Sequence, residues 1–299
     1  MENSADLTAQ KYFVPAKRSI LRSLKIRGRK LIFRNSTHSP YLSMDSLANL
    51  ADYYVFGKNG LEALDEVKAK ISKIIFVNSD QIEKIDFKYF PNLKVVLAGN
   101  ADRNFESIPD VPPSVNLLLL MACSINTTKV KTLPVGLENK RNGRYTVNEI
   151  FFRSIQNQEF KPKVLVPPMS NTNPIRGSAI TEALKLNKIY DVQTEYLYEK
   201  KYLSLIKKYK FVLCLEGNCF ESHRIWETLY LGVFPVMFRT KWSKGLEDLK
   251  LPIYYIDKLS DITPEKLLDF WDINKSFNPK NSPTLWLDYW KKLINDNLS

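Results

Sequence analysis

Cysteine is scarce in this chain. Only three cysteines occur among its 299 residues, Cys123, Cys214 and Cys219. Their odd number and their spacing fit neither a disulfide framework nor a zinc site, and they indicate a reducing compartment. The sequence also contains no phosphate-binding P-loop and no Gly-x-Gly-x-x-Gly motif, which argues against the kinases and dehydrogenases that use these motifs.

Long hydrophobic runs are missing as well. The longest uninterrupted apolar run, residues 117–123, is far shorter than the roughly 20 residues that a membrane-spanning helix needs. The N-terminal residues contain no basic segment followed by a hydrophobic core, so no signal peptide is predicted. An apolar content of 44% and a mean hydropathy of -0.27 are typical of a soluble globular protein. We therefore expect a cytoplasmic protein.

Acidic residues are outnumbered by basic residues, 32 to 44, which gives a net charge of +12. The excess is concentrated in residues 17–34, where eight basic residues and no acidic residue occur. Ile20, Leu21 and Leu24 lie among them at helical spacing. One interpretation is a basic amphipathic helix that contacts the inner face of an anionic membrane peripherally, and the alternative is a solvated basic face.

Nucleic-acid binding is a third interpretation of the basic charge, and the isoelectric point of about 9.4 permits it. However, no zinc finger or RNA-binding motif occurs in the chain. No nucleic-acid partner is therefore expected.

Apolar runs and helical patterns alternate along the first half of the chain. Strands are expected at residues 73–78, 92–98 and 114–121, and helices at residues 47–56 and 61–71. Such an alternation predicts a parallel sheet with helices on its faces. A chain of 299 residues is long enough for two domains of about 150 residues, each with its own core.

The polar segment 156–162 is the expected linker between domains that span residues 1–160 and 161–299. In the last expected helix, Trp286, Tyr289, Trp290 and Leu293 form a stripe at helical spacing, which predicts core packing. The elements expected in the second domain are the strands 163–166, 211–215, 233–238 and 251–256 and the helices 178–186, 199–209, 264–271 and 283–295.

Segment 210–238 is predicted to form a strand, a helix and a second strand, and it contains residues that could bind an anion. Its two apolar runs are typical of parallel strands that are buried on both faces, and a helix is expected between them. Ser222 is the expected N-cap of this helix and Gly232 its end. His223 and Arg224 then lie in the first turn, where unpaired backbone N–H groups and the helix dipole favour an anion.

Glu227 follows Arg224 by three residues. This spacing predicts a cation and a carboxylate on one helical face, about 4.5 Å apart along the axis. A phosphate could contact Arg224, and a sugar hydroxyl could contact Glu227. The alternative is a surface ion pair that contributes a few tenths of a kcal/mol. The preceding Glu216-Gly217-Asn218 loop favours the ligand interpretation, because α/β sheets bind ligands at the carboxyl ends of their strands.

The pattern that runs from Glu216 through Arg224 and Glu227 to Pro235 resembles the donor-binding segment of exostosin-like glycosyltransferases and, more distantly, of α1,3-fucosyltransferases. The sequence departs from that pattern at Thr228, where Ala is more usual, and at Leu215, where Pro is more usual. The resemblance implies a GT-B fold, an α/β architecture in which the parallel sheets of two Rossmann-like domains face a central cleft. It also implies that Arg224 contacts the diphosphate of a nucleotide-sugar and Glu227 a hydroxyl of its ribose or sugar.

Three further segments extend the resemblance. Residues 131–139 are similar to the turn that follows the last strands of the N-terminal domain in bacterial members. Residues 97–102 are similar to a strand end of that domain, with Gly99 at the position where the family carries His. Residues 163–176 are similar to the opening of the second domain, an Asn-Thr-Asn-Pro loop followed by Arg.

The donor-binding residues are therefore expected in two loops and in the helix between the strands of segment 210–238. Most of them also have a structural interpretation. His223 could be a second helix cap, Glu216 and Asn218 could close their own loop, and an Asn-Thr-Asn-Pro sequence is also an ordinary turn. The candidates are Arg224, Glu227, Glu216, Gly217, Asn218, Ser222, His223, Asn171, Asn173 and Arg176.

The chain contains no Asp-x-Asp pair, with which many metal-dependent glycosyltransferases hold a divalent ion. We therefore expect no metal and no cofactor, and a leaving diphosphate stabilised by Arg224 and the helix N-terminus. An inverting enzyme would also need a general base. The candidates are His38, Asp102 and Glu138, and Asp102 is preferred because it follows an expected strand that ends at the cleft.

The function that these observations predict is transfer of a sugar from a nucleotide-sugar to a glycan or a lipid-linked acceptor, in the synthesis of a surface polysaccharide or glycan. One alternative is a non-catalytic module that binds nucleotide-sugars or glycans. The other is a nucleic-acid-binding protein that uses residues 17–34, whose affinity would fall steeply with salt.

Overall fold

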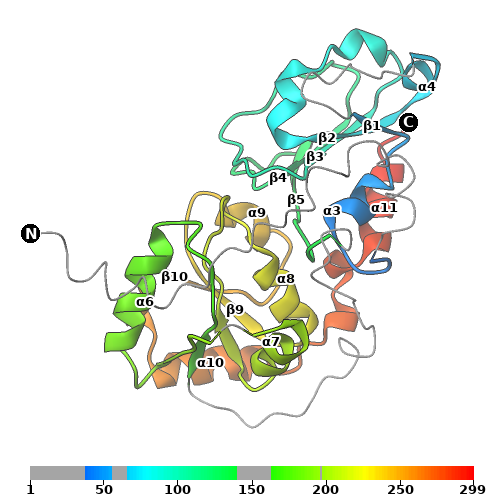
Figure 1. Ribbon diagram of the computed structural model, residues 1–299. Helices are drawn as coiled ribbons and strands as arrows, with labels where there is room; N and C mark the ends of the chain where they lie inside the picture. The colour runs from blue at the N-terminus through cyan, green and yellow to red at the C-terminus, as the bar shows by residue number, and fades with distance from the viewer. Residues whose placement is uncertain (1–37, 56–65, 140–162, 196) are drawn as a thin grey trace, which may run out of the picture.

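The structure is a computed structural model that describes residues 38–55, 66–139, 163–195 and 197–299. The basic segment 17–34 and the expected linker 156–162 lie outside the described residues. The described chain forms two parallel sheets of five strands each, with helices around them (Figure 1). The expected α/β class is confirmed, and the arrangement is compatible with two Rossmann-like domains.

The strands of the first sheet follow one another in chain order, β1-β2-β3-β4-β5, and all neighbours are parallel. Every residue of β3 and β4 is buried, which agrees with apolar runs covered on both faces. The strands are β1 Tyr53–Val55, β2 Ile74–Asn78, β3 Val95–Gly99, β4 Leu117–Met121 and β5 Val130–Leu133.

The second sheet has the order β10-β9-β8-β6-β7, and it is also entirely parallel. The chain leaves β6 toward β7 on one side and then returns to build β8, β9 and β10 on the other side. The strand order therefore reverses between β6 and β8. The strands are β6 Val164–Val166, β7 Tyr190–Val192, β8 Phe211–Leu213, β9 Phe234–Phe238 and β10 Tyr254–Ile256.

Helices cover both sheets and connect most of the strands. The first domain contains α3 Met44–Ala48, α4 Glu66–Ile71 and two 3₁₀ turns, η2 Ser79–Lys84 and η3 Phe87–Tyr89. Around the second sheet lie α6 Ile175–Lys185, α7 Glu199–Ile206, α8 His223–Tyr230, α9 Ser243–Glu247, η5 Leu259–Asp261 and α10 Pro264–Asn274, and the chain ends with η6 Pro279–Asn281, η7 Pro283–Leu285 and α11 Leu287–Asn295.

Side chains alternate between the faces of each sheet. In β2, Ile75 and Val77 belong to a cluster on one face, whereas Phe76 belongs to a cluster on the other. The cluster of Phe76 continues into the second domain, where it includes Val212 of β8 and Trp226 of α8. The two sheets are thus joined by one continuous apolar core.

The C-terminal helix returns to the first domain. In Figure 1, α11 lies beside α3, and residues of the two helices are in contact. The Leu287 N–H donates to the carbonyl of Pro40 at 3.0 Å. The side-chain amide of Asn116 donates to the carbonyls of Asn297 and Ser299 at 3.1 and 2.8 Å. The end of the chain therefore fastens the two domains together.

Two expected helices are wrong in part. The helix expected over 47–56 ends at Ala48, because the following residues pair with β2: the Asp52 N–H donates to the carbonyl of Ile74, and the Asp52 carboxylate accepts from the Ile74 N–H. The helix expected over 283–295 is divided in two by Trp286, whose backbone is extended at φ -117° and ψ 143°. Core packing of the aromatic stripe is confirmed for Trp290, which is 1% exposed, and in part for Trp286 and Leu293, which pack against the core. It is wrong for Tyr289, which is 38% exposed.

Among the described residues, no helix is long and apolar enough to cross a membrane.

Candidate functional site

The strand order of the second sheet reverses between β6 and β8, and this point predicts where a ligand would bind. In open α/β sheets, ligands bind outside the carboxyl ends of the strands where the order reverses, since the two connections leave in opposite directions there. In this protein the loop after β6 and the loop after β8 meet at that point. Among the strands that the structure describes, those of the first sheet show no reversal, so the rule selects the second sheet.

Arg176 of α6 connects these two loops. Its side chain is buried, and its Nε donates to the carbonyl of Glu216 at 2.7 Å while its Nη1 donates to the carbonyl of Ser170 at 2.8 Å. Asn173 adds a second connection, because its amide nitrogen donates to the carbonyl of Gly217 at 3.0 Å. Residues from both predicted donor-binding loops are therefore brought together.

Arg224 lies in the first turn of α8 and contacts α7 and the loop after β6. Its Nε donates to the hydroxyl of Tyr202 at 2.8 Å, and its Nη2 donates to the carbonyl of Pro168 at 2.9 Å. The guanidinium carbon lies 5.8 Å from the centre of the Tyr202 ring. Ser222 is the N-cap residue, as predicted, but its hydroxyl forms no capping hydrogen bond.

The two guanidinium groups form a local excess of positive charge. Burial, together with the charge of the nearby Arg224, lowers the pKa of Arg176 to about 10. Among the described residues, no carboxylate forms an ion pair with either arginine. Burial raises the pKa of the Glu216 carboxyl, although a hydrogen bond from Asn173 opposes that shift. Two cations held together without a carboxylate favour an anionic ligand.

Glu227 lies one turn further along α8 and is 3% exposed. Asn171, in the loop after β6, is exposed, and so is Asn218, in the loop after β8. The predicted contacts of these residues with a sugar or a nucleotide stay predictions.

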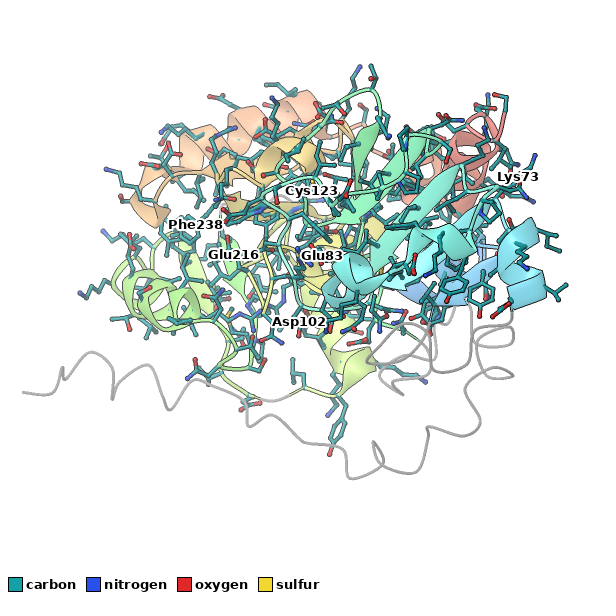
Figure 2. The ribbon with its side chains drawn as sticks, turned by 90° about the horizontal axis from the view of Figure 1, so that it is seen from above. Lys73, Glu83, Asp102, Cys123, Glu216 and Phe238 are labelled. Atoms are coloured by element: carbon teal, nitrogen blue, oxygen red, sulfur yellow. The ribbon has the colours of Figure 1, made fainter. Side chains whose placement is uncertain are left out.

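The loop after β8 also contacts the first domain. The Asn218 amide donates to the Asp102 carboxylate at 2.8 Å, and the Phe220 N–H donates to the Asn104 side-chain oxygen at 2.9 Å. Asp102 is exposed and follows β3, and Figure 2 labels it together with Glu216 near the middle of the molecule. One candidate base is thus hydrogen-bonded to a candidate donor-binding residue.

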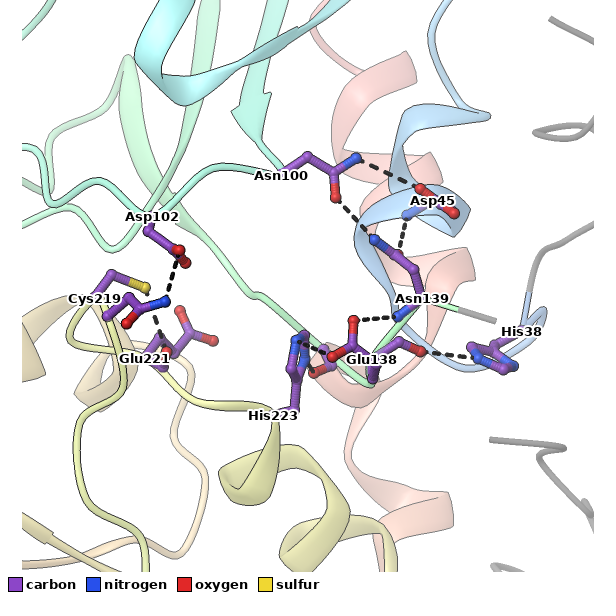
Figure 3. A network of polar contacts seen from close by, with 11 residues as sticks. His38, Asp45, Asn100, Asp102, Glu138, Asn139, Cys219, Glu221 and His223 are labelled. Atoms are coloured by element: carbon purple, nitrogen blue, oxygen red, sulfur yellow. Dashed lines mark hydrogen bonds and ion pairs between the residues drawn. The ribbon is translucent and has the colours of Figure 1, made fainter. Parts of the chain in front are cut away.

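His223 faces the end of the first sheet. Its Nδ1 lies 2.8 Å from the carbonyl oxygen of Gly136, so this nitrogen must carry the proton. Its Nε2 lies 3.6 Å from an oxygen of the Glu138 carboxylate (Figure 3). His223 and Glu138 are 30% and 15% exposed at their side chains. They form a partly accessible ion pair whenever the imidazole is protonated.

His38 is the least accessible of the three candidate bases. It is 4% exposed, and its Nε2 lies 3.0 Å from the backbone carbonyl of Glu138. Since a carbonyl oxygen only accepts, Nε2 must donate its proton there. His38 therefore supports the backbone that carries Glu138.

Glu221 is a residue that the sequence analysis missed. It is 3% exposed, and its Oε1 accepts from the Val135 N–H of the first domain at 2.8 Å and from the indole N–H of Trp226 at 2.6 Å. Burial raises the pKa of Glu221 to about 7, and these two hydrogen bonds oppose the shift. Its other oxygen is buried and has no hydrogen-bond partner among the described residues. A glutamate in a polar loop carries no sequence signal for such burial.

A second polar network lies at the carboxyl end of β3 (Figure 3). Asn100 adopts a left-handed backbone at φ 58°, and its side-chain oxygen accepts from the amide of Asn139 at 2.9 Å. The side-chain oxygen of Asn139 in turn accepts from the N–H of Asp45 at 2.8 Å. At Gly99, where the resembling family carries His, Met44 and Phe76 fill the space beside the backbone. A side chain at this position would have to displace Met44.

Within the part of the chain that the structure describes, no three His, Cys, Asp or Glu residues are grouped so as to hold a metal ion. The expected metal independence stays a prediction, because it concerns the reaction.

Comparison of the chain with models of known protein families and with curated protein sequences finds no match.

Proposed function

We propose that this protein is a glycosyltransferase of the GT-B type that binds a nucleotide-sugar at the strand reversal of its second sheet. The donor diphosphate contacts Arg224 and the first turn of α8. Arg176 is a positioning residue in this proposal, since its hydrogen bonds to the carbonyls of Glu216 and Ser170 hold the two loops together.

The observation that carries the proposal is the pair of arginines without a carboxylate partner. Burying like charges together is costly, and an anion between or beside them would offset that cost. A guanidinium group can form two parallel hydrogen bonds to a phosphate, which suits a diphosphate better than a single point charge does. The strand order supports the same location independently.

The contacts between the domains support the arrangement that a transferase needs. Asp102, Asn104 and Glu138 of the first domain lie against the loop after β8 and the start of α8. An acceptor on the side of the first domain would therefore lie close to the donor.

In an inverting reaction, the acceptor hydroxyl attacks the anomeric carbon and gives its proton to a carboxylate. The bond to the diphosphate breaks, and the leaving oxygen takes the electron pair beside Arg224. Asp102 is the preferred base because it is exposed and hydrogen-bonded to Asn218, and Glu138 is the second candidate. A retaining reaction would need no such base.

A thermal-shift screen against nucleoside diphosphates and nucleotide-sugars, with and without EDTA, tests the donor site. A ligand at about 100 times its Kd stabilises the native state by about 2.7 kcal/mol. We expect one nucleotide to raise the melting temperature equally with and without EDTA. Release of nucleoside diphosphate from the matching nucleotide-sugar would then distinguish an enzyme from a binding module.

Three variants make the test specific. Arg224→Ala should weaken nucleotide binding by about tenfold to 100-fold, and Arg224→Lys should weaken it less, because the charge stays but the forked donors are lost. Lys185→Ala, at an exposed position of α6, is the control with the same loss of charge. If no nucleotide binds, or if Arg224→Ala behaves like Lys185→Ala, the proposed donor site is wrong.

A further inference from the structure

A pocket of about 400 Å³ opens beside α7, at the carboxyl end of β7. Its lining comes from α7, from the loop that leads into this helix and from the turn that follows it. The pocket is lined by Gln193, Glu195, Leu197, Lys200, Lys201, Ser204, Leu205 and Lys208.

The pocket has a net positive charge. Its three lysines, Lys200, Lys201 and Lys208, are exposed, and none of them forms an ion pair with a carboxylate of the described residues. Among the lining side chains that the structure describes, Glu195 is the acidic one, so these side chains carry three positive charges and one negative charge, +2 in total. An anion with two negative charges would balance the lining.

Asp191, a carboxylate in the strand that leads to the pocket, is engaged elsewhere. It accepts from the amide of Gln193 at 2.8 Å and from the hydroxyl of Tyr209. Asp191 therefore does not neutralise the pocket lysines.

The pocket is separate from the arginine site. Tyr202 of α7 is hydrogen-bonded to Arg224 at 2.8 Å, and it is not a lining residue of the pocket. Neither arginine lines the pocket. The two sites thus use different side chains of the same helix.

We propose that this pocket binds a phosphate group. A phosphate monoester carries a charge of about -1.5 to -2 at neutral pH, which matches the charge of the lining. Lysine ammonium groups bind phosphate as point charges, and the Ser204 hydroxyl offers another donor. Leu197 and Leu205 add apolar surface for the rest of the ligand. The phosphate comes from a soluble ester or from a lipid headgroup, and the chemistry of recognition is the same.

The test measures the acetylation rate of each lysine by mass spectrometry, with three probes. The probes are inorganic phosphate, phosphatidylcholine vesicles with phosphatidic acid, and the same vesicles without it, all against sodium chloride of equal ionic strength, because salt alone screens surface charge. We expect phosphate or phosphatidic acid to slow the acetylation of Lys200, Lys201 and Lys208. Lys185, the last residue of α6, and Lys188, in the turn that follows, are exposed lysines that should not respond.

Variants separate this pocket from the arginine site. Protection should be unchanged in Arg224→Ala, so failure of the proposed donor site would leave this result intact. The double variant Lys201→Gln, Lys208→Gln should need at least about tenfold more probe to protect Lys200, which corresponds to about 1.4 kcal/mol. Lys185→Gln, Lys188→Gln is the control with the same change of charge.

Each outcome decides the proposal. Protection by inorganic phosphate identifies a soluble ligand, and protection by phosphatidic acid vesicles alone identifies a lipid headgroup. The proposal is overturned if neither probe protects the pocket lysines, if Lys185 and Lys188 are protected equally, or if the two double variants behave alike.

Discussion

Replacing Glu221 by glutamine should remove a pH dependence of stability that this buried carboxyl creates. The side chain of Glu221 is 3% exposed, and burial raises its pKa from 4.5 to about 7. The folded protein therefore binds this proton more tightly than the unfolded chain does. The stabilisation is complete below the unfolded pKa and is lost as the pH rises through the folded pKa.

The size of the effect follows from the two pKa values. A shift from 4.5 to about 7 corresponds to about 3.4 kcal/mol in total. Between about pH 5 and about pH 8, the contribution of Glu221 to the free energy of unfolding should fall by about 2.5 kcal/mol. Glutamine retains an oxygen that can accept from the Val135 N–H and from the Trp226 indole, but it does not titrate.

Urea unfolding at a series of pH values, followed by tryptophan fluorescence, measures the effect in the native protein and the variant. At each pH, the unfolding free energy of Glu221→Gln is subtracted from that of the native protein. The change of this difference with pH is informative, because any constant cost of burying the amide cancels. Glu106→Gln, the same replacement at an exposed residue paired with Lys241, is the matched control. Parallel profiles for the native protein and Glu221→Gln would refute the reasoning.

Three further changes test the packing and the mechanism. Gly245→Ala should destabilise the protein by roughly 1–3 kcal/mol, because its Cβ would lie 1.7 Å from the Thr132 hydroxyl; an unchanged urea midpoint would contradict this contact. Tyr230→Phe should cost about 1–3 kcal/mol in urea unfolding, since the Leu42 N–H loses its buried acceptor. Asp102→Asn should leave nucleotide binding intact and slow release of nucleoside diphosphate by at least about 100-fold; an unaltered rate would exclude Asp102 as the base.

Apart from β10, an edge strand that is predicted, the strands that the sequence predicts lie inside the sheets and those that it misses lie at the edges. Central strands such as β3, β4 and β8 are covered on both faces, so they are continuous apolar runs that can be recognised in the sequence. The missed strands, β1, β5 and β7, are all at the edge of a sheet. They are short and contain partly exposed residues such as Lys131 and Asp191, so no continuous apolar run identifies them.

Some features of the candidate site can likewise be predicted from the sequence, and others cannot. The sequence alone predicts that Ser222 begins a helix, that Arg224 lies in its first turn and that Gly232 ends it, and the helix is found there with Gly232 at φ 70°. These features depend on residues close together in the chain, whose capping and backbone preferences are local.

Only the tertiary structure decides which loops meet. The order β10-β9-β8-β6-β7 brings Arg176 next to Arg224, although the two are 48 positions apart in the chain. The burial of Glu221 between Val135 and Trp226 likewise requires both domains. Strand order and burial arise from contacts between distant segments, and a local pattern of residues carries little information about them. The sequence by itself determined the central strands and helix α8 with the residues it carries, and the packing of the two sheets decided which of these groups share a site.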